Sequence, residues 1–148
     1  ISQSSQRTQQ IAADIAHKLL KQDGASNATI IGLTGQLGSG KTTFVQGFAR
    51  GLGIVARILS PTFTIVRQYP LQNKRFETLY HLDLYRIDEH ALGGLGIDEI
   101  IANSKNIALV EWIEKAPTLM KRADIHISFQ QQSDTTRLII INTHLMCV

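Results

Sequence analysis

The residues with the clearest chemistry form one glycine-rich run, Gly35-Gln36-Leu37-Gly38-Ser39-Gly40-Lys41-Thr42. This run matches the phosphate-binding pattern G-x-x-x-x-G-K-[ST] at every fixed position. Its glycines can adopt backbone angles that are closed to other residues, so main-chain N–H groups can approach phosphate oxygens. The pattern therefore predicts a site for a nucleoside triphosphate and Mg²⁺.

The polar residues of this loop have separate predicted roles. We expect Lys41 to reach the β- and γ-phosphates and the Thr42 hydroxyl to coordinate Mg²⁺. Thr43, one residue further on, is placed to touch the α-phosphate. The other nucleotide-binding positions are expected to be Gly35, Leu37, Gly38, Ser39 and Gly40. A merely flexible glycine turn would need neither the lysine nor the hydroxyl.

A phosphate loop also needs a carboxylate that orients the metal, usually at the end of an apolar strand beside the loop strand. Glu111 follows the apolar residues 107–110, and Asp83 ends the run 79–82 in a similar way. We expect Glu111 to orient Mg²⁺, directly or through water, and Asp83 to lie near the γ-phosphate or the attacking water. Either acid could instead cap a neighbouring helix, and the sequence leaves open which of the two contacts Mg²⁺ directly.

A further candidate segment is Ser60-Pro61-Thr62-Phe63-Thr64, which follows the expected phosphate helix. Nucleotide hydrolases commonly have a switch loop at this point. Its hydroxyls, that of Thr62 among them, could reach Mg²⁺ or the γ-phosphate and so order the loop when a triphosphate is bound. The alternative is a proline-led turn with solvated hydroxyls.

The loop needs a strand before it and a helix after it, and the sequence predicts both. Residues 28–34 form a short β-rich apolar run, typical of a strand that is buried on both faces of a parallel sheet. Residues 42–50 place Phe44 and Phe48 on one helical face and are followed by glycines that end the helix.

The rest of the pattern predicts further strands and helices around this unit. An amphipathic helix is expected between Ser2 and Gln22. A short turn at 70–75 joins strands in 60–69 and 76–83, which permits only an antiparallel hairpin. The other expected elements are short kinked helices in 89–102, a central strand at 107–112, and a terminal pair of strands at 124–130 and 136–142.

These elements predict an α/β fold, with one P-loop NTPase-like domain over residues 1–148. Its central sheet is expected to be mixed and mostly parallel, with an antiparallel hairpin and helices on both faces. Hydrophobic residues make up 43% of the chain and charged residues 18%, and no apolar run approaches the length of a membrane span. We therefore expect no membrane association and a cytoplasmic location.

The charge and the histidine spacing bear on two further possibilities, nucleic-acid binding and a structural metal site. A net charge of +3 is compatible with RNA or polyphosphate partners, but no dense block of lysine and arginine points to direct nucleic-acid binding. The five histidines match no zinc or di-iron spacing, so no structural metal is expected.

Taken together, the motifs resemble the TsaE family, also called YjeE, the small bacterial ATPases of tRNA threonylcarbamoyladenosine (t6A) synthesis. The resemblance extends from about Ile11 to Trp112 and rests on the loop at 35–43, the segment at 60–64, Tyr80-His81-Leu82-Asp83-Leu84-Tyr85-Arg86, Leu95-Gly96-Ile97 and Val110-Glu111-Trp112. It implies an ATPase with weak activity of its own that cycles the TsaD–TsaB pair, which transfers a threonylcarbamoyl group to tRNA. Contact with tRNA would be indirect.

The resemblance also implies roles for single residues. Lys41 and Thr42 keep their phosphate and magnesium roles, and Thr62 falls in the switch-like loop. Asp83 and Glu111 match the acids that catalysis and metal binding require. A functionally sensitive aromatic residue of the family corresponds to Trp112.

The contacts to the nucleotide base are implied at the two ends of the chain. The family's N-terminal segment touches the base, which implies Ser5, Thr8 or their neighbours here. The chain lacks the Gly-Arg pair expected near the nucleotide in its C-terminal region, so Arg137 and the turn at Ser133-Asp134 are the candidates there.

Three other functions can be weighed against this one. A small-molecule P-loop kinase needs an arginine-bearing lid, but no Arg-x-x-x-Arg cluster follows the central strands, and Arg86 alone would have to serve. A regulatory GTPase would need an Asn-Lys-x-Asp segment to read guanine, and the chain contains none. A nucleotide-gated binding module with little turnover would use ATP mainly to control assembly.

Overall fold

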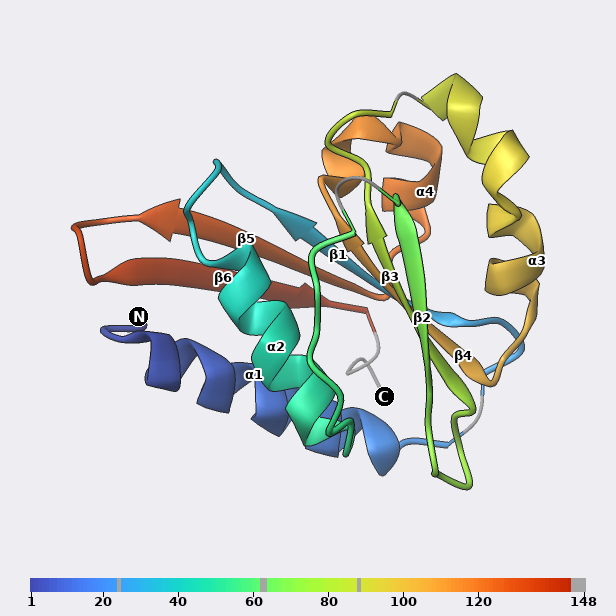
Figure 1. The fold of residues 1–148 in the computed structure, drawn as a ribbon, viewed down its shortest axis with the longest axis horizontal. Helices are drawn as coiled ribbons and strands as arrows, with labels where there is room; N and C mark the ends of the chain where they lie inside the picture. The colour runs from blue at the N-terminus through green and yellow to red at the C-terminus, as the bar shows by residue number, and fades with distance from the viewer. Residues whose placement is uncertain (24, 62–63, 88, 145–148) are drawn as a thin grey trace.

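In the described part of the chain, a six-stranded sheet forms the centre of the molecule (Figure 1). The computed structural model describes residues 1–23, 25–61, 64–87 and 89–144. The strands lie in the order β2-β3-β4-β1-β5-β6. Four parallel strands occupy the middle: β3 (Thr78–Asp83), β4 (Asn106–Glu111), β1 (Thr29–Thr34) and β5 (Ile125–Gln131). The edge strands β2 (Val66–Pro70) and β6 (Arg137–Thr143) each pair antiparallel with their neighbour.

Helices cover both faces of this sheet (Figure 1). One face carries α1 (Ser5–Leu20) and α2 (Lys41–Gly51), whose buried side chains join one apolar cluster. The other face carries α3 (Ile97–Ala102), η2 (Ile113–Lys115) and α4 (Pro117–Lys121), preceded by η1 (Glu89–Leu95). The predicted fold class, with its mixed sheet and helices on both faces, is therefore confirmed.

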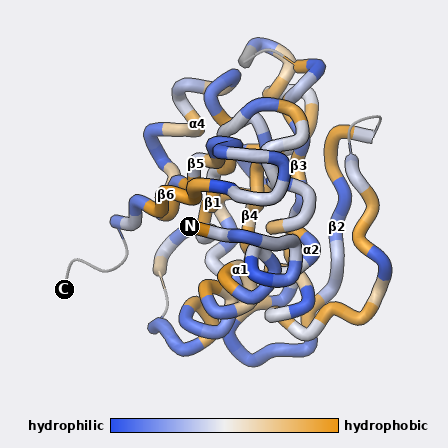
Figure 2. The backbone as a smooth tube through the Cα atoms, turned by 90° about the vertical axis from the view of Figure 1, so that its left-hand side faces the viewer, coloured by the Kyte–Doolittle hydropathy of each residue, from blue (hydrophilic) through white to orange (hydrophobic). Residues whose placement is uncertain are grey.

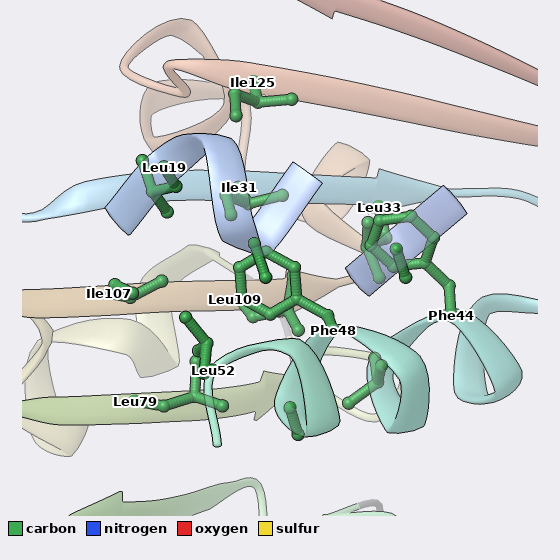
Figure 3. Close-up of a cluster of buried hydrophobic side chains, with 14 of the residues drawn as sticks. Leu19, Ile31, Leu33, Phe44, Phe48, Leu52, Leu79, Ile107, Leu109 and Ile125 are labelled. Atoms are coloured by element: carbon green, nitrogen blue, oxygen red, sulfur yellow. The ribbon is translucent and has the colours of Figure 1, made fainter. Parts of the chain in front are cut away.

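The strands themselves divide the core into these two clusters. Ile30 belongs to the α3 and α4 side and Ile31 to the α1 and α2 side, because successive side chains of a strand point to opposite faces. Almost every residue of β1 and β4 is buried, as expected for parallel strands covered on both faces. Figure 3 shows the larger cluster, in which Phe44 and Phe48 of α2 join apolar side chains of α1 and the strands.

Close packing of α1 against α2 brings the start of the chain to the phosphate loop. A Cβ atom added to Gly47 would lie 2.4 Å from the main chain of Gln9, so only glycine allows this approach. The expected helix over Ser2–Gln22 is shorter than predicted: Ser4 caps it by accepting a hydrogen bond from the Arg7 N–H, and Ser2 pairs with β6 instead. Figure 2 shows the N-terminus beside β6, with hydrophilic and hydrophobic residues alternating along α1.

The other predicted elements are close to their expected bounds. The 89–102 region forms η1 and α3, separated at Gly96, whose φ of 70° produces the expected kink. The antiparallel hairpin of β2 and β3 was expected from the sequence, and so was the pairing of β5 with β6, which the structure shows to be antiparallel as well. Among the described residues, no helix has both the length and the apolar character that a membrane crossing requires.

Candidate active site

The predicted phosphate loop opens onto a cleft of about 590 Å³ at the carboxyl ends of the central strands. This edge is where open α/β sheets bind their ligands. The cleft is lined by Gln3, Ser4, Ser5, Thr8, Leu37, Gly38, Ser39, Gly40, Lys41, Thr42, Thr43, Ser60, Asp83, Glu111, Trp112, Asp134, Thr135 and Arg137. The fold thus brings together nearly all residues that the sequence singled out, although they come from six separate segments.

The loop backbone has the conformation that its glycines permit. Gly35 has a φ of 147°, and an added Cβ atom there would lie 2.8 Å from the carbonyl oxygen of Phe129. Gly40 immediately precedes α2 and has a φ of 108°, and no described side chain caps the helix at this point. The first N–H groups of α2 and the positive end of its dipole are therefore available to an anion in the cleft.

Lys41 is held inside the loop. Its Nζ donates hydrogen bonds to the carbonyl oxygens of Gly35 and Gln36, the latter at 3.1 Å, and lies 4.1 Å from the centre of the Trp112 ring. Only 5% of the residue is exposed. Burial lowers the pKa of Lys41, and this effect is opposed by the charge of Glu111 and, more weakly, of other nearby carboxylates. A phosphate would supply the charged acceptors that the carbonyl groups only partly replace.

The two predicted acids are neighbours in the sheet. Asp83 and Glu111 end β3 and β4 at the same register position, and both are buried. They lie on the α2 face, since Leu79 and Leu109, at even spacings on the same strands, belong to the α2 cluster. The Asp83 carboxylate accepts a hydrogen bond of 2.9 Å from the Tyr85 N–H. Two carboxylates therefore line the cleft that contains Lys41 and Thr42.

A third side chain, which the sequence analysis quoted in a motif but gave no role, contacts this acid pair. His81 Nε2 lies 2.8 Å from Glu111 Oε2, and both side chains are almost fully buried. The spacing of His81 and Asp83 puts them on the same face of β3 and could have indicated this. The contact with Glu111 could not be anticipated without knowing that β3 and β4 are adjacent.

Trp112, whose place the sequence left open, lines the cleft. It follows β4 with a φ of 60°, which ends the strand at Glu111. Its N–H donates to the Leu33 carbonyl at 3.0 Å, so the turn is tied to the strand that carries the phosphate loop. Its ring packs on Tyr85, with the ring centres 5.0 Å apart, and on the Lys41 ammonium.

The N-terminal segment meets the start of β6 on another side of the cleft. The main chains of Ser2 and Arg137 exchange two hydrogen bonds of 2.8 and 2.7 Å, and Ser2 Oγ lies 2.7 Å from Thr8 Oγ1. The Arg137 guanidinium donates to the Gly38 carbonyl at 3.3 Å. Ser5 and Arg137, the expected base contacts, are thereby placed next to the phosphate loop.

Three predicted residues differ from this group in position. Gly35 begins the phosphate loop but does not itself line the cleft. Thr62 lies outside the described residues, although Ser60 from the same segment lines the cleft. Leu37 projects from the loop and is 67% exposed, so its side chain lies at the rim and only its main chain suits a phosphate.

The available donors fit a magnesium ion held together with a nucleotide. The Thr42 hydroxyl and the Glu111 and Asp83 carboxylates are oxygen donors, which Mg²⁺ prefers. In the described part of the chain, no group of three or more His, Cys, Asp or Glu side chains could hold a metal alone. Mg²⁺ usually takes one or two carboxylates and completes its shell with waters and substrate phosphates, so this donor set suits it.

The matching family model and the curated relatives carry the name TsaE. The family model "Threonylcarbamoyl adenosine biosynthesis protein TsaE" matches residues 2–139. The Bacillus subtilis protein named tRNA threonylcarbamoyladenosine biosynthesis protein TsaE is 37% identical over 78% of this chain and 70% of its own length. The Treponema pallidum protein of the same name is 34% identical over 81% and 93%, respectively. The crystal structure of YdiB from Bacillus subtilis superimposes with a TM-score of 0.68, at 31% identity over 95% of this chain and 80% of that one.

Proposed function

The chain belongs to the TsaE family of threonylcarbamoyladenosine biosynthesis, and from this premise we propose that it is a Mg²⁺-dependent ATPase. Its ATP cycle would reset the TsaD–TsaB transferase between turnovers in the cytoplasm, with tRNA met through that pair. One observation carries the proposal: the phosphate loop and the paired acids Asp83 and Glu111 line the same cleft.

In the proposed complex, the loop binds the triphosphate through its main chain. The N–H groups around Gly40 and the first turn of α2 donate to phosphate oxygens. Lys41 exchanges its two carbonyl acceptors for β- and γ-phosphate oxygens, and its buried position strengthens that attraction. The Ser39 hydroxyl is buried and has no hydrogen-bond partner among the described residues, which suits a further phosphate contact.

The acids act at the other side of the γ-phosphate. When bound, Mg²⁺ neutralises charge on the β- and γ-phosphates. Thr42 and Glu111 are the residues that would hold it. We assign to Asp83, which lies at the same register position as Glu111, the role of accepting a hydrogen bond from the attacking water and so orienting it.

Hydrolysis and complex formation test the proposal separately. Phosphate release from ATP should be slow for the chain alone and should rise when TsaD, TsaB and tRNA are added. Immobilised chain should retain the TsaD–TsaB pair in the presence of ATP, whereas Lys41→Ala should not.

Three outcomes would contradict the proposal in different ways. Failure to retain TsaD–TsaB in ATP would remove the pathway role while leaving an ATPase. Rapid phosphorylation of a free metabolite would identify a small-molecule kinase instead. Retention of the pair at ATP occupancy, without any increase in phosphate release, would identify a nucleotide-gated binding module.

A further inference from the structure

His81 is a buried polar residue with only one partner in the described part of the molecule. Its Nε2 lies 2.8 Å from Glu111 Oε2, whereas its Nδ1 is buried and has no hydrogen-bond partner among the described residues. A carboxylate can only accept a hydrogen bond, so Nε2 is the donor to Glu111. The contact with Glu111 therefore determines that Nε2 is the ring nitrogen that carries the donated proton.

His81 is well placed to hold the Glu111 side chain in one orientation. The residue lies in the middle of the buried strand β3, which pairs with β2 on one side and β4 on the other. A side chain on such a strand has little freedom to move. Because His81 occupies one oxygen of Glu111, the other oxygen is left for the cleft that Glu111 lines.

Glu111 and Lys41 carry opposite charges and line the same cleft, so Lys41 can act as a competing partner for Glu111. The charge of Glu111 also opposes the lowering of the Lys41 pKa by burial. If Glu111 turned to pair with Lys41, the phosphate-binding cation and the metal-binding carboxylate would neutralise each other. A neighbour that holds Glu111 by a hydrogen bond from another strand prevents that pairing.

We infer that His81 is a positioning residue that fixes Glu111 for Mg²⁺ binding and keeps it apart from Lys41. This inference rests on the proposed function. It assigns His81 no contact with the nucleotide. Partners of this kind typically change metal affinity or activity by about 10- to 100-fold when removed.

The test compares two replacements of His81 that differ in hydrogen bonding. His81→Gln keeps an N–H donor at a similar reach, whereas His81→Leu keeps an apolar side chain of similar bulk and has no donor. Each protein is titrated with Mg²⁺ at a fixed concentration of a non-hydrolysable ATP analogue. Trp112, the single tryptophan, lies 4.1 Å from the Lys41 ammonium and reports binding by its fluorescence.

We expect His81→Leu to raise the Mg²⁺ concentration at half-saturation by about 10- to 100-fold. His81→Gln should stay within a few-fold of wild type, and analogue affinity without Mg²⁺ should be equal in all proteins. In hydrolysis assays, His81→Leu should lower kcat and leave the KM for ATP nearly unchanged. Leu79→Val is the matched control, since Leu79 is buried on the same face of β3 but aligns with Ile107 rather than Glu111.

Each result decides between a positioning and a merely structural role. Equal Mg²⁺ responses of folded His81→Leu and wild type would overturn the inference, and so would a weakened response in the Leu79→Val control. Should His81→Leu not fold, a weakened Mg²⁺ response in folded His81→Gln would also overturn it. A wild-type protein with no Mg²⁺-dependent analogue binding would instead overturn the proposed function, and the inference with it.

Discussion

The cleft has two walls that are built in different ways. The phosphate wall consists of residues 35–43 with Asp83 and Glu111, and the side chains of Ser39, Lys41, Asp83 and Glu111 are buried. The terminal wall consists of residues 3–5, Thr8 and residues 134–137, and it is mostly exposed. Strand pairing over the length of β1, β3 and β4 sets the first wall, whereas a bridge between Ser2 and Arg137 joins the two halves of the second.

This difference suggests that the phosphate wall carries out the chemistry, whereas the terminal wall contributes to nucleotide recognition and can adapt. Many cooperative hydrogen bonds and a packed core fix the phosphate wall, so a single change at its charged residues should be felt strongly. The terminal wall is held by few contacts, and local opening of such segments costs little free energy. We therefore expect substitutions in the phosphate wall to abolish function and those in the terminal wall to tune affinity.

The largest effect is expected for Lys41→Ala. Hydrogen bonds to charged groups contribute about 1.5–3 kcal/mol each, so the loss of contacts to two phosphates should weaken ATP binding by about 100-fold or more. Isothermal titration with ATP and Mg²⁺ measures this. Lys115→Ala is the control, because this ammonium also lies near Trp112, at 5.9 Å, but does not line the cleft. Equal losses in both variants would contradict a specific role for the loop lysine.

Glu111→Gln should separate binding from hydrolysis. The amide retains an oxygen that can accept from His81, so the fold should persist, but it removes the negative charge that orients the metal. Hydrolysis should fall by about 100-fold or more, as is typical when a catalytic acid or base is removed. Single-turnover phosphate release measures the loss, and Glu114→Gln, outside the cleft lining, is the control. Normal hydrolysis by Glu111→Gln would show that another residue is the required acid.

The same comparison explains which parts of the site could be predicted from sequence. The phosphate loop is contiguous, and the strand before it and the helix after it have strong local patterns. Asp83 and Glu111 could be chosen because each ends an apolar run. Their side-by-side position and the partner of His81 depend on strand order, which no local pattern in β3 or β4 encodes.

The terminal wall was harder to predict for a physical reason. The hydrophobic period of α1 suggested a helix from Ser2, but a hydrogen-bonded bridge to Arg137 and a cap at Ser4 delay its start to Ser5. This bridge joins residues that are far apart in the sequence, so the local pattern around Ser2 or around Arg137 does not predict it. Resemblance to a family placed Ser5 and Arg137 near the nucleotide, and their contribution to binding stays a prediction.

Arg137→Ala tests that contribution. Its guanidinium donates to the Gly38 carbonyl at 3.3 Å, and the side chain is only half-buried. We expect ATP affinity to fall by about fivefold, because a solvent-accessible hydrogen bond contributes about 1 kcal/mol. The melting temperature should change little. Arg50→Ala, an exposed arginine near the end of α2, is the control in the same titration. A loss as large as that of Lys41→Ala would remove the distinction between the two walls.

The smallest effect is expected at Asp124, far from the cleft at the other end of β1. Its carboxylate accepts a 2.8 Å hydrogen bond from the Ile30 N–H, and burial raises its pKa above the ordinary value of 3.8. The folded state therefore binds a proton more tightly than the unfolded state. Stability from this group is greatest at acid pH and is lost as the pH rises from 3.8 through the raised pKa.

Asp124→Asn keeps an oxygen acceptor for Ile30 and removes the charge. At pH 7 the variant should be more stable than wild type, because it lacks the buried charge, whereas at pH 3.5 the two proteins should be nearly equal. The gain in the free energy of unfolding at pH 7 should be less than ~1 kcal/mol, the contribution of one hydrogen bond. Urea unfolding at the two pH values measures this difference. ATP affinity should not change, since the phosphate wall is fixed by pairing along the whole of β1 rather than by its first residues. A loss of affinity in a fully folded Asp124→Asn protein would show instead that strain at the start of β1 reaches the phosphate loop.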